Sequence, residues 1–464
     1  MMKKVIVITG MALAVLLTAC SDWVNVSPKQ EVESDKLFSS ENGYKSALIG
    51  VYARMTLTGN YGKALSYGYI ENLVQRYDNY DASVAPSEAS RAELYNYKNN
   101  SNAKSYVNNV WSGLFNSIAN LNSLLFRLEN GGRDIVLTEG LWEQMKGEAL
   151  GLRAFHYFDL LRLYGPIYSV NPKMECLPWR TELSADPKML LPADEIAGHI
   201  LDDLKEAEKL LAGDRLNSDR KHRMNLMAVK GLMARVYLWI GDKENAADKA
   251  GEVINESGLE LVTNNSRDVS MFDETIFALG MDDMAEKVRG DWADLTLFSN
   301  ELYISEGNFN TVFEAMGEGR SDIRGRSGYG FIHGQGGSKL CRKYLGKDIE
   351  YSENIPLIRL AEMYYIMAES VSLQESASYF NRVRNARGIS RNDNKEFYDE
   401  DARRDALNKE YQKEFFAEGQ WFYFLKRHNY RTFHRCPTTI SSMSENYVLP
   451  TPDDEIAYGV GSEK

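Results

Sequence analysis

The chain has 464 residues, 44% hydrophobic and 26% charged, a composition that is ordinary for a soluble globular protein with a large buried core. Its formal net charge of -12 excludes a nucleic-acid-binding role, because no basic stripe is available to displace counterions from phosphates. Its 27 tyrosines are the one unusual feature of the composition.

Residues 1–19 have the pattern of a lipoprotein signal peptide. Two lysines precede an apolar run, residues 5–17, that is too short to span a bilayer. The sequence LTAC at residues 17–20 resembles a bacterial lipobox and predicts that Cys20 is lipidated, which would give stable membrane anchoring. An ordinary secretory signal with a chance cysteine is the alternative. Residues 20–40 are then a tether, and 41–464 a domain outside the cytoplasm.

Apolar residues recur at helical spacing along most of this domain. The expected helices span residues 41–55, 106–128, 139–164, 193–211, 224–240, 246–254, 357–371, 377–386 and 400–416, with a short one near 69–75. Residues 149–164 are apolar or aromatic on every side, which puts this helix in the middle of an α-helical core.

The turn after residue 240 has a recognisable pattern. Ala234, Tyr237, Gly241, Ala246 and Ala250 are spaced as in the turn region of a tetratricopeptide repeat. The glycine lets the chain reverse, and the alanines let the second helix pack closely on the first. This pattern predicts helical hairpins.

Two stretches lack helical regularity, residues 58–102 and 258–354. The second is rich in glycine and carries aromatic residues that no helical stripe requires. Loops this long in a compact domain are usually functional. We therefore expect an all-α scaffold over about 41–257 and 355–464, with a loop-rich part that faces the ligand.

The sequence lacks the common enzyme motifs. It has no G-x-S-x-G, P-loop or H-E-x-x-H motif, and its histidines have no metal-ligand spacing. Several charged residues stand within the helical core pattern, and we interpret them as paired parts of the scaffold; they are Arg153, Asp159, Arg162, Arg359, Glu362 and Arg384. We predict no catalytic residue, cofactor or metal site. The sequence does not determine whether two of Cys176, Cys341 and Cys436 form a disulfide.

The chain resembles the SusD/RagB family of outer-membrane nutrient-binding lipoproteins. The most recognisable run is EALGLRAFHYFDLLRLYG at residues 148–165. Further matching runs follow in the family's order, at residues 47–52, 111–120, 228–237, 356–364, 381–388, 410–427 and 449–456. The chain departs from the family pattern at 421–426, where the family usually has a His or Arg before the Trp and an Asp near the end.

The resemblance implies tetratricopeptide-like helix pairs (a SusD-like α-α superhelix) with a long loop-rich insertion. It also implies a non-catalytic protein on the cell surface that binds oligosaccharides. The protein would deliver them to a TonB-dependent, SusC-like outer-membrane transporter. Trp111 and Trp421 lie within the matching runs, so we expect them in the core.

Sugar binding needs flat aromatic faces for C–H groups, and amides, carboxylates or Arg for hydroxyls. Two stretches, 67–97 and 290–313, supply both. The candidate ligand-binding residues are Tyr67, Tyr69, Arg76, Asp78, Asn79, Tyr80, Tyr95, Trp292 and Tyr303. In the family, a loop after the second helix borders the ligand site, and the first stretch lies there. For each tyrosine, a half-buried loop position without ligand contact is the alternative.

Three other functions remain open at this point. The protein could be a structural lid of the transporter, a binder of a non-sugar nutrient, or a glycan-active enzyme. An enzyme of this last kind needs two carboxylates in a cleft, which the sequence alone does not exclude.

Overall fold

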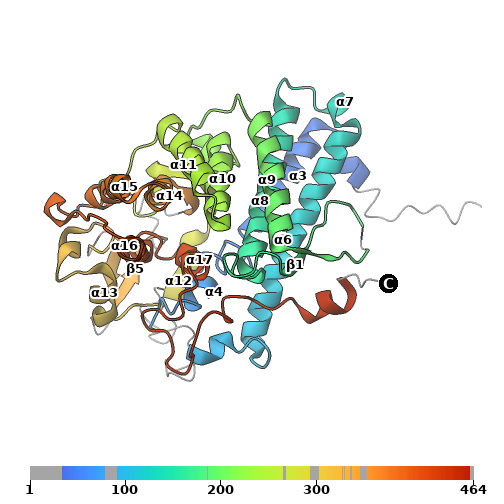
Figure 1. Cartoon of the computed structure of the whole chain (residues 1–464). Coiled ribbons are helices and arrows are strands. Elements are labelled where there is room, and N and C mark those ends of the chain that lie inside the picture. Colours follow the sequence, from blue (N-terminus) through green and yellow to red (C-terminus); the bar gives the residue numbers. More distant parts are fainter. Residues whose placement is uncertain are drawn as a thin grey trace, which may run out of the picture.

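The computed structural model describes residues 34–78, 91–184, 186–264, 268–292, 302–326, 328, 330–334, 337–344 and 353–459. Helices dominate these residues, and the strands are few and short (Figure 1). The predicted all-α class is confirmed. Cys20, and with it the signal peptide and most of the tether, lies outside the described residues.

Each expected helix has a counterpart in the structure, whose described part also forms helices outside the expected ranges, at residues 133–135, 284–292, 306–313 and 420–427. The helices are α3 (Glu41–Met55), α4 (Tyr69–Asn72), α6 (Ser101–Arg127), α7 (Arg133–Ile135), α8 (Leu141–Tyr164), α9 (Ala193–Leu210), α10 (Leu226–Ile240), α11 (Lys243–Glu256), α12 (Met284–Trp292), α13 (Glu306–Phe313), α14 (Leu360–Ser370), α15 (Leu373–Ala386), α16 (Glu400–Glu414) and α17 (Gln420–Arg427). Side-chain caps fix several starts. Ser40 accepts from the Gly43 amide at α3, and Asn100 accepts from Ala103 at α6.

Helix α8 is the centre of the core, as its sequence predicts. Every residue from Gly147 to Tyr164 is buried. Helices α6 and α9 pack against it, and the three lie side by side in Figure 1. Trp111 and Trp421 are also buried, so their predicted core positions are confirmed.

The tetratricopeptide-like hairpin forms where the spacing predicts it. Gly241 adopts φ 87°, a left-handed conformation that ends α10, and the Asp242 side chain accepts from the Asn245 amide to begin α11. Helix α11 packs against α14, and α14 against α15, so helix pairs continue across the long irregular stretch. That stretch is therefore an insertion in the scaffold.

The largest difference from the expected elements is at the start of α14. The sequence predicts a helix from Leu357, but residues Asn354–Arg359 form strand β6, which pairs antiparallel with β3 (Thr275–Gly280). All six residues of β6 are buried, and a continuous buried apolar run fits a strand as well as a helix. The other strand pairs are β1 (Glu175–Pro178) with β2 (Leu190–Pro192), and β4 (Phe331–His333) with β5 (Lys339–Cys341).

Two of the three remaining cysteines have free, buried thiols. Burial raises the pKa of Cys176 to about 12 and that of Cys341 to about 11, so neither thiol is reactive at neutral pH. Neither takes part in a disulfide. Among the described residues, no helix combines the length and the apolar composition that crossing a membrane requires.

Candidate functional site

Asp78 joins three segments that are far apart in the sequence. Its backbone amide donates to the Tyr303 carbonyl at 2.7 Å, and its carboxylate accepts from the Ser305 amide at 2.6 Å and from the Asn308 side chain at 2.8 Å. The Arg435 guanidinium lies 2.9 Å from the same carboxylate. We name Asp78, Tyr303, Ser305, Asn308, His434 and Arg435 the three-segment cluster.

Local structure explains why these groups meet. Ser305 precedes α13, so the carboxylate of Asp78 lies at the helix N-terminus, where the backbone N–H groups and the helix dipole favour negative charge. Arg435 adopts φ 70° and also donates to the Gln75 carbonyl at 2.8 Å. Asp78 is thus held from both sides. Its charge and that of Arg435 offset one another.

The outer part of the cluster is accessible. His434 is exposed, and Tyr303 and Asn308 are half-buried. The His434 Nε2 lies 3.3 Å from the Asn308 Oδ1. Partial burial and the neighbouring Arg435 lower the pKa of His434, so its imidazole is neutral at pH 7. An amide, a neutral imidazole and a phenol ring can recognise a neutral ligand rich in hydroxyl groups.

Four of the residues predicted to bind ligand are buried. The exposed fractions of Tyr67, Tyr69, Arg76 and Tyr95 are 1%, 3%, 3% and 7%. Protein encloses their rings and polar atoms. The alternative of a loop position without ligand contact therefore describes them better than direct binding. They are buried more deeply than the half-buried position expected.

Two of these residues, Arg76 and Tyr95, anchor the segment that leads to Asp78. Arg76 pairs with Glu71 at 2.8 Å and its guanidinium lies 4.6 Å from the Trp421 ring and 4.8 Å from the Phe416 ring. The Tyr95 hydroxyl accepts from Gln75, whose carbonyl binds Arg435. The segment that carries Asp78 is therefore anchored in the core.

The remaining predicted residues divide into two groups. Asp78 and Tyr303 belong to the cluster, so the two predicted stretches do meet. Asn79, Tyr80 and the side chain of Trp292 lie outside the described residues. Trp292 is the last residue of α12, whereas the sequence predicts a loop at this position.

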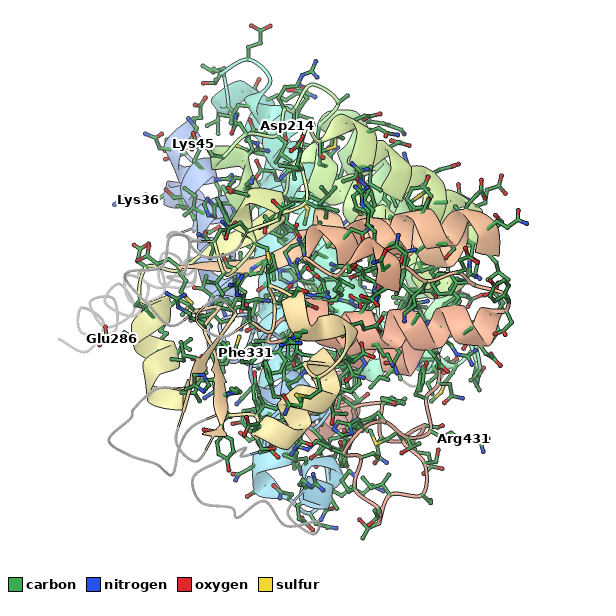
Figure 2. The ribbon with its side chains drawn as sticks, turned by 90° about the vertical axis from the view of Figure 1, so that its left-hand side faces the viewer. Lys36, Lys45, Asp214, Glu286, Phe331 and Arg431 are labelled. Atoms are coloured by element: carbon green, nitrogen blue, oxygen red, sulfur yellow. The ribbon has the colours of Figure 1, made fainter. Side chains whose placement is uncertain are left out.

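Sequence reasoning missed His434 and Arg435. They lie in an irregular segment after α17 whose residues follow no helical or strand period, and nothing in their spacing relates them to Asp78. The sequence points to one neighbour of these two residues, Asn308, which lies in the second predicted stretch. In both figures the segment after α17 and the residues that lead into α6 lie at the same lower end of the molecule (Figure 2, where Arg431 is labelled).

A separate hollow of about 520 Å³ lies between α3 and β3. Its lining includes Ile49, Tyr52, Arg223 and Met281. The Tyr52 hydroxyl donates to Glu148 at 2.8 Å, Arg223 lies 4.9 Å from the Tyr52 ring, and Tyr52 is only 9% exposed. We therefore favour the three-segment cluster as the candidate site. Within the described part of the chain, no group of His, Cys, Asp and Glu side chains is arranged to hold a metal ion.

Known proteins similar to this chain share one fold. A SusD superfamily protein from Bacteroides vulgatus matches 92% of this chain and 100% of its own, with 20% identity and a TM-score of 0.71. A laminarin-binding SusD-like protein matches 90% of this chain and 97% of its own, with 18% identity and a TM-score of 0.62. At these identities the likeness shows the fold.

Two relatives identified by sequence are matched over only part of their own length. A SusD-like protein from Bacteroides ovatus is 26% identical over 287 residues, and SusD-like protein P38 from Formosa agariphila is 26% identical over 267 residues. The matched part spans about half the length of these relatives, 46% and 47%.

Two family matches cover most of the chain. Residues 22–238 match a family described as starch-binding and associating with the outer membrane, and residues 274–456 match the family described as SusD. The matching runs of the sequence, the helix pairs and these two matches agree. The chain belongs to the SusD family.

Proposed function

We propose that this protein binds oligosaccharides at the bacterial cell surface and delivers them to a TonB-dependent, SusC-like transporter. The three-segment cluster is the centre of the binding surface. No catalytic step takes place there.

The observation that carries the proposal is the contact of Asp78 with residues 303–308. It connects the two stretches whose composition suits sugar recognition. The accessible groups of the cluster, an amide, a neutral imidazole and a half-buried tyrosine ring, match sugar hydroxyls and C–H faces. The family description as starch-binding and the printed name of the laminarin-binding neighbour support a glycan as the ligand class.

The location and the partner rest on other support. The LTAC run predicts a lipid on Cys20, and the family description includes association with the outer membrane. A lipid-anchored binding protein at that surface needs a channel for uptake of its ligand. We therefore propose a SusC-like barrel as the partner and an outward-facing position.

Titration calorimetry tests the proposed binding. The full-length protein is purified in a sugar-free detergent such as lauryldimethylamine oxide and titrated with maltoheptaose, laminarihexaose, cellohexaose and xylohexaose. We expect saturable binding of at least one oligosaccharide and no shortening of it on prolonged incubation. Shortened products would instead identify a glycan-active enzyme. No binding, with the transporter still captured in a pull-down, would support the structural lid.

Substitutions at the cluster test the site. We expect His434→Ala and Asn308→Ala each to weaken binding by about three- to tenfold, the loss of one hydrogen bond. Asp78→Asn leaves Arg435 without its negative partner and removes one anchor of the surface, so a larger loss is expected. Trp292→Ala tests the predicted aromatic of the second stretch, and binding should weaken with helicity unchanged.

Tyr398→Ala is the matched control. Tyr398 is 83% exposed, precedes α16 and donates to Glu396, outside the cluster. Its removal should leave affinity unchanged. Wild-type affinity in the His434, Asn308 and Asp78 variants together would contradict the proposed site while leaving glycan binding itself in place.

A further inference from the structure

Tyr106 presents one free aromatic face at the start of α6. Its ring stacks on that of Tyr69, with centroids 4.7 Å apart and planes 10° from parallel. A parallel stack covers one face of a ring. Tyr106 is nevertheless 41% exposed, whereas Tyr69 is 3% exposed, so the exposed area of Tyr106 belongs to its other face and its edge.

The stack fixes the orientation of this ring. Tyr69 belongs to α4 and is held in the core, so Tyr106 lies on a rigid support. A tyrosine ring that is already oriented loses little conformational entropy when a ligand covers it. The predicted ligand residue Tyr69 is thus the support, and Tyr106, which helical spacing alone does not distinguish, is the accessible ring.

Neutral polar groups flank the ring. Asn102 and Asn109 lie four residues before and three residues after Tyr106, so helical geometry puts all three on one face of α6, and all three are exposed. The Asn109 amide nitrogen donates to the Ser105 hydroxyl at 3.4 Å, so its amide oxygen is not used in that bond. The nearby cation, Lys104, pairs with Asp453 at 2.6 Å.

We infer that Asn102, Tyr106 and Asn109 form a subsite that stacks one neutral pyranose unit of a bound oligosaccharide. The C–H face of the sugar covers the free face of Tyr106, and its hydroxyls bond to the two amides. A charged sugar is disfavoured because Lys104, the cation in the first turn of α6, is already paired with Asp453. This inference rests on the proposed function, and it adds a contact outside the three-segment cluster.

The two surfaces are joined through residues 69–78. Tyr69 supports Tyr106, and Asp78, nine residues on, is the hub of the cluster. In Figure 2 the light-blue residues that lead into α6 and the loop carrying Arg431 lie at the same lower end of the molecule.

The test compares two substitutions of the same ring. Full-length protein is titrated in lauryldimethylamine oxide with whichever of maltoheptaose, laminarihexaose, cellohexaose and xylohexaose the wild type binds. Tyr106→Ala should weaken affinity by about three- to tenfold, and Tyr106→Phe, which keeps the ring, should stay within about twofold of the wild type. Thermal unfolding midpoints establish that both variants fold.

A second readout does not depend on substitution. Tetranitromethane nitrates exposed tyrosines, and mass spectrometry measures the extent at each one. The bound oligosaccharide should protect Tyr106 and leave Tyr398, 83% exposed, fully reactive.

Each other result has a separate meaning. Wild-type affinity in Tyr106→Ala, or equal losses in Tyr106→Ala and Tyr106→Phe, would overturn the stacking subsite and leave the proposed function intact. Loss of transporter capture in Tyr106→Ala with unchanged sugar affinity would identify the ring as a protein contact and overturn the inference. Absence of binding by the wild type would overturn the proposed function, and this inference with it.

Discussion

At the scale of single residues, the charged groups inside the core are paired, though not always as their spacing suggests. Asp159 pairs with Arg162 three residues on and accepts from the Tyr61 hydroxyl at 2.6 Å. Glu362, three residues after Arg359, pairs instead with Arg235 of α10. A three-residue separation permits an ion pair when both residues lie in one helix. Here Arg359 belongs to strand β6 and Glu362 to α14, so the two side chains do not share a helix face.

His156 of α8 predicts a specific pH dependence. Complete burial lowers its pKa from 6.5 to about 4, while Asp159 opposes this shift and the Tyr61 hydroxyl lies 3.5 Å from its Nδ1. Between these values the unfolded chain binds more protons than the folded one, so the free energy of unfolding falls as the pH falls. From pH 7 to pH 4.5 we expect His156 to account for a loss of about 2 kcal/mol.

Urea unfolding of the wild type and His156→Phe across this pH range measures that contribution. The variant keeps a ring of similar shape and cannot titrate, so its curve should fall less steeply. Parallel curves would mean that His156 has the same pKa in the folded and unfolded states.

At the scale of elements, a buried ionic network fastens the insertion to the helix pairs. Arg359 of β6 lies 2.8 Å from Glu274 and 2.6 Å from Glu414 of α16. Arg387, just after α15, lies 2.6 Å and 2.7 Å from the same carboxylates. Because all four side chains are buried, each depends on the others for compensation of its charge.

Glu414→Gln should therefore be strongly destabilising. Burial raises the pKa of Glu414, but the guanidinium groups of Arg387, Arg359 and Arg324 outweigh it and hold this pKa well below its ordinary value. The substitution leaves these groups with too little negative charge. We expect a loss of about 3–5 kcal/mol in the free energy of unfolding, measured in urea. Asp401→Asn on the same helix is the control, since Asp401 is 79% exposed and pairs with the exposed arginine three residues later, and it should cost less than about 1 kcal/mol. Equal effects of the two substitutions would argue against the network.

Two glycines predict opposite effects of alanine. Gly241 ends α10 with φ 87°, where an alanine should cost about 1–2 kcal/mol. Gly198 lies exposed within α9, and a Cβ there meets no neighbour within 4 Å, so an alanine should add about 0.5–1 kcal/mol. Thermal unfolding of both variants measures the signs. A stabilising Gly241→Ala would contradict the left-handed turn.

At the scale of the whole molecule, the proposed binding surface lies at one end. The segment after α4, the start of α6, the insertion before α13 and the segment after α17 meet there, while α8 and its neighbours form the body (Figure 1). A surface assembled from loops on a rigid helical body can change its ligand without changing the fold.

The proposed anchor predicts a change of location without a change of fold. In cells, the wild type should sediment with outer membranes and incorporate labelled palmitate. Cys20→Ala removes the thiol that accepts the lipid, so the variant should lose the label and leave the membrane fraction, with its circular dichroism unchanged. Membrane association of the unlabelled variant would contradict anchoring through Cys20.

The sequence by itself determined the scaffold. The apolar residues 149–164, the Gly241 turn and the runs at 356–364 and 410–427 predict the helix pairs and their family, because helical periodicity and turn chemistry are local properties. The start of α14 is the exception, since a short buried run reads equally as strand or helix, and pairing with β3 decided it.

Only the tertiary structure decided which side chains of the candidate site reach the surface. Composition selected two stretches, and Asp78 of the first contacts Tyr303 of the second. Tyr67, Tyr69, Arg76 and Tyr95 have the same residue types as a sugar site, but they pack into the core, and the accessible groups are Tyr106, Asn308 and His434. Burial and proximity across more than 350 residues of chain, as between Asp78 and Arg435, depend on how distant segments pack, which no local pattern encodes.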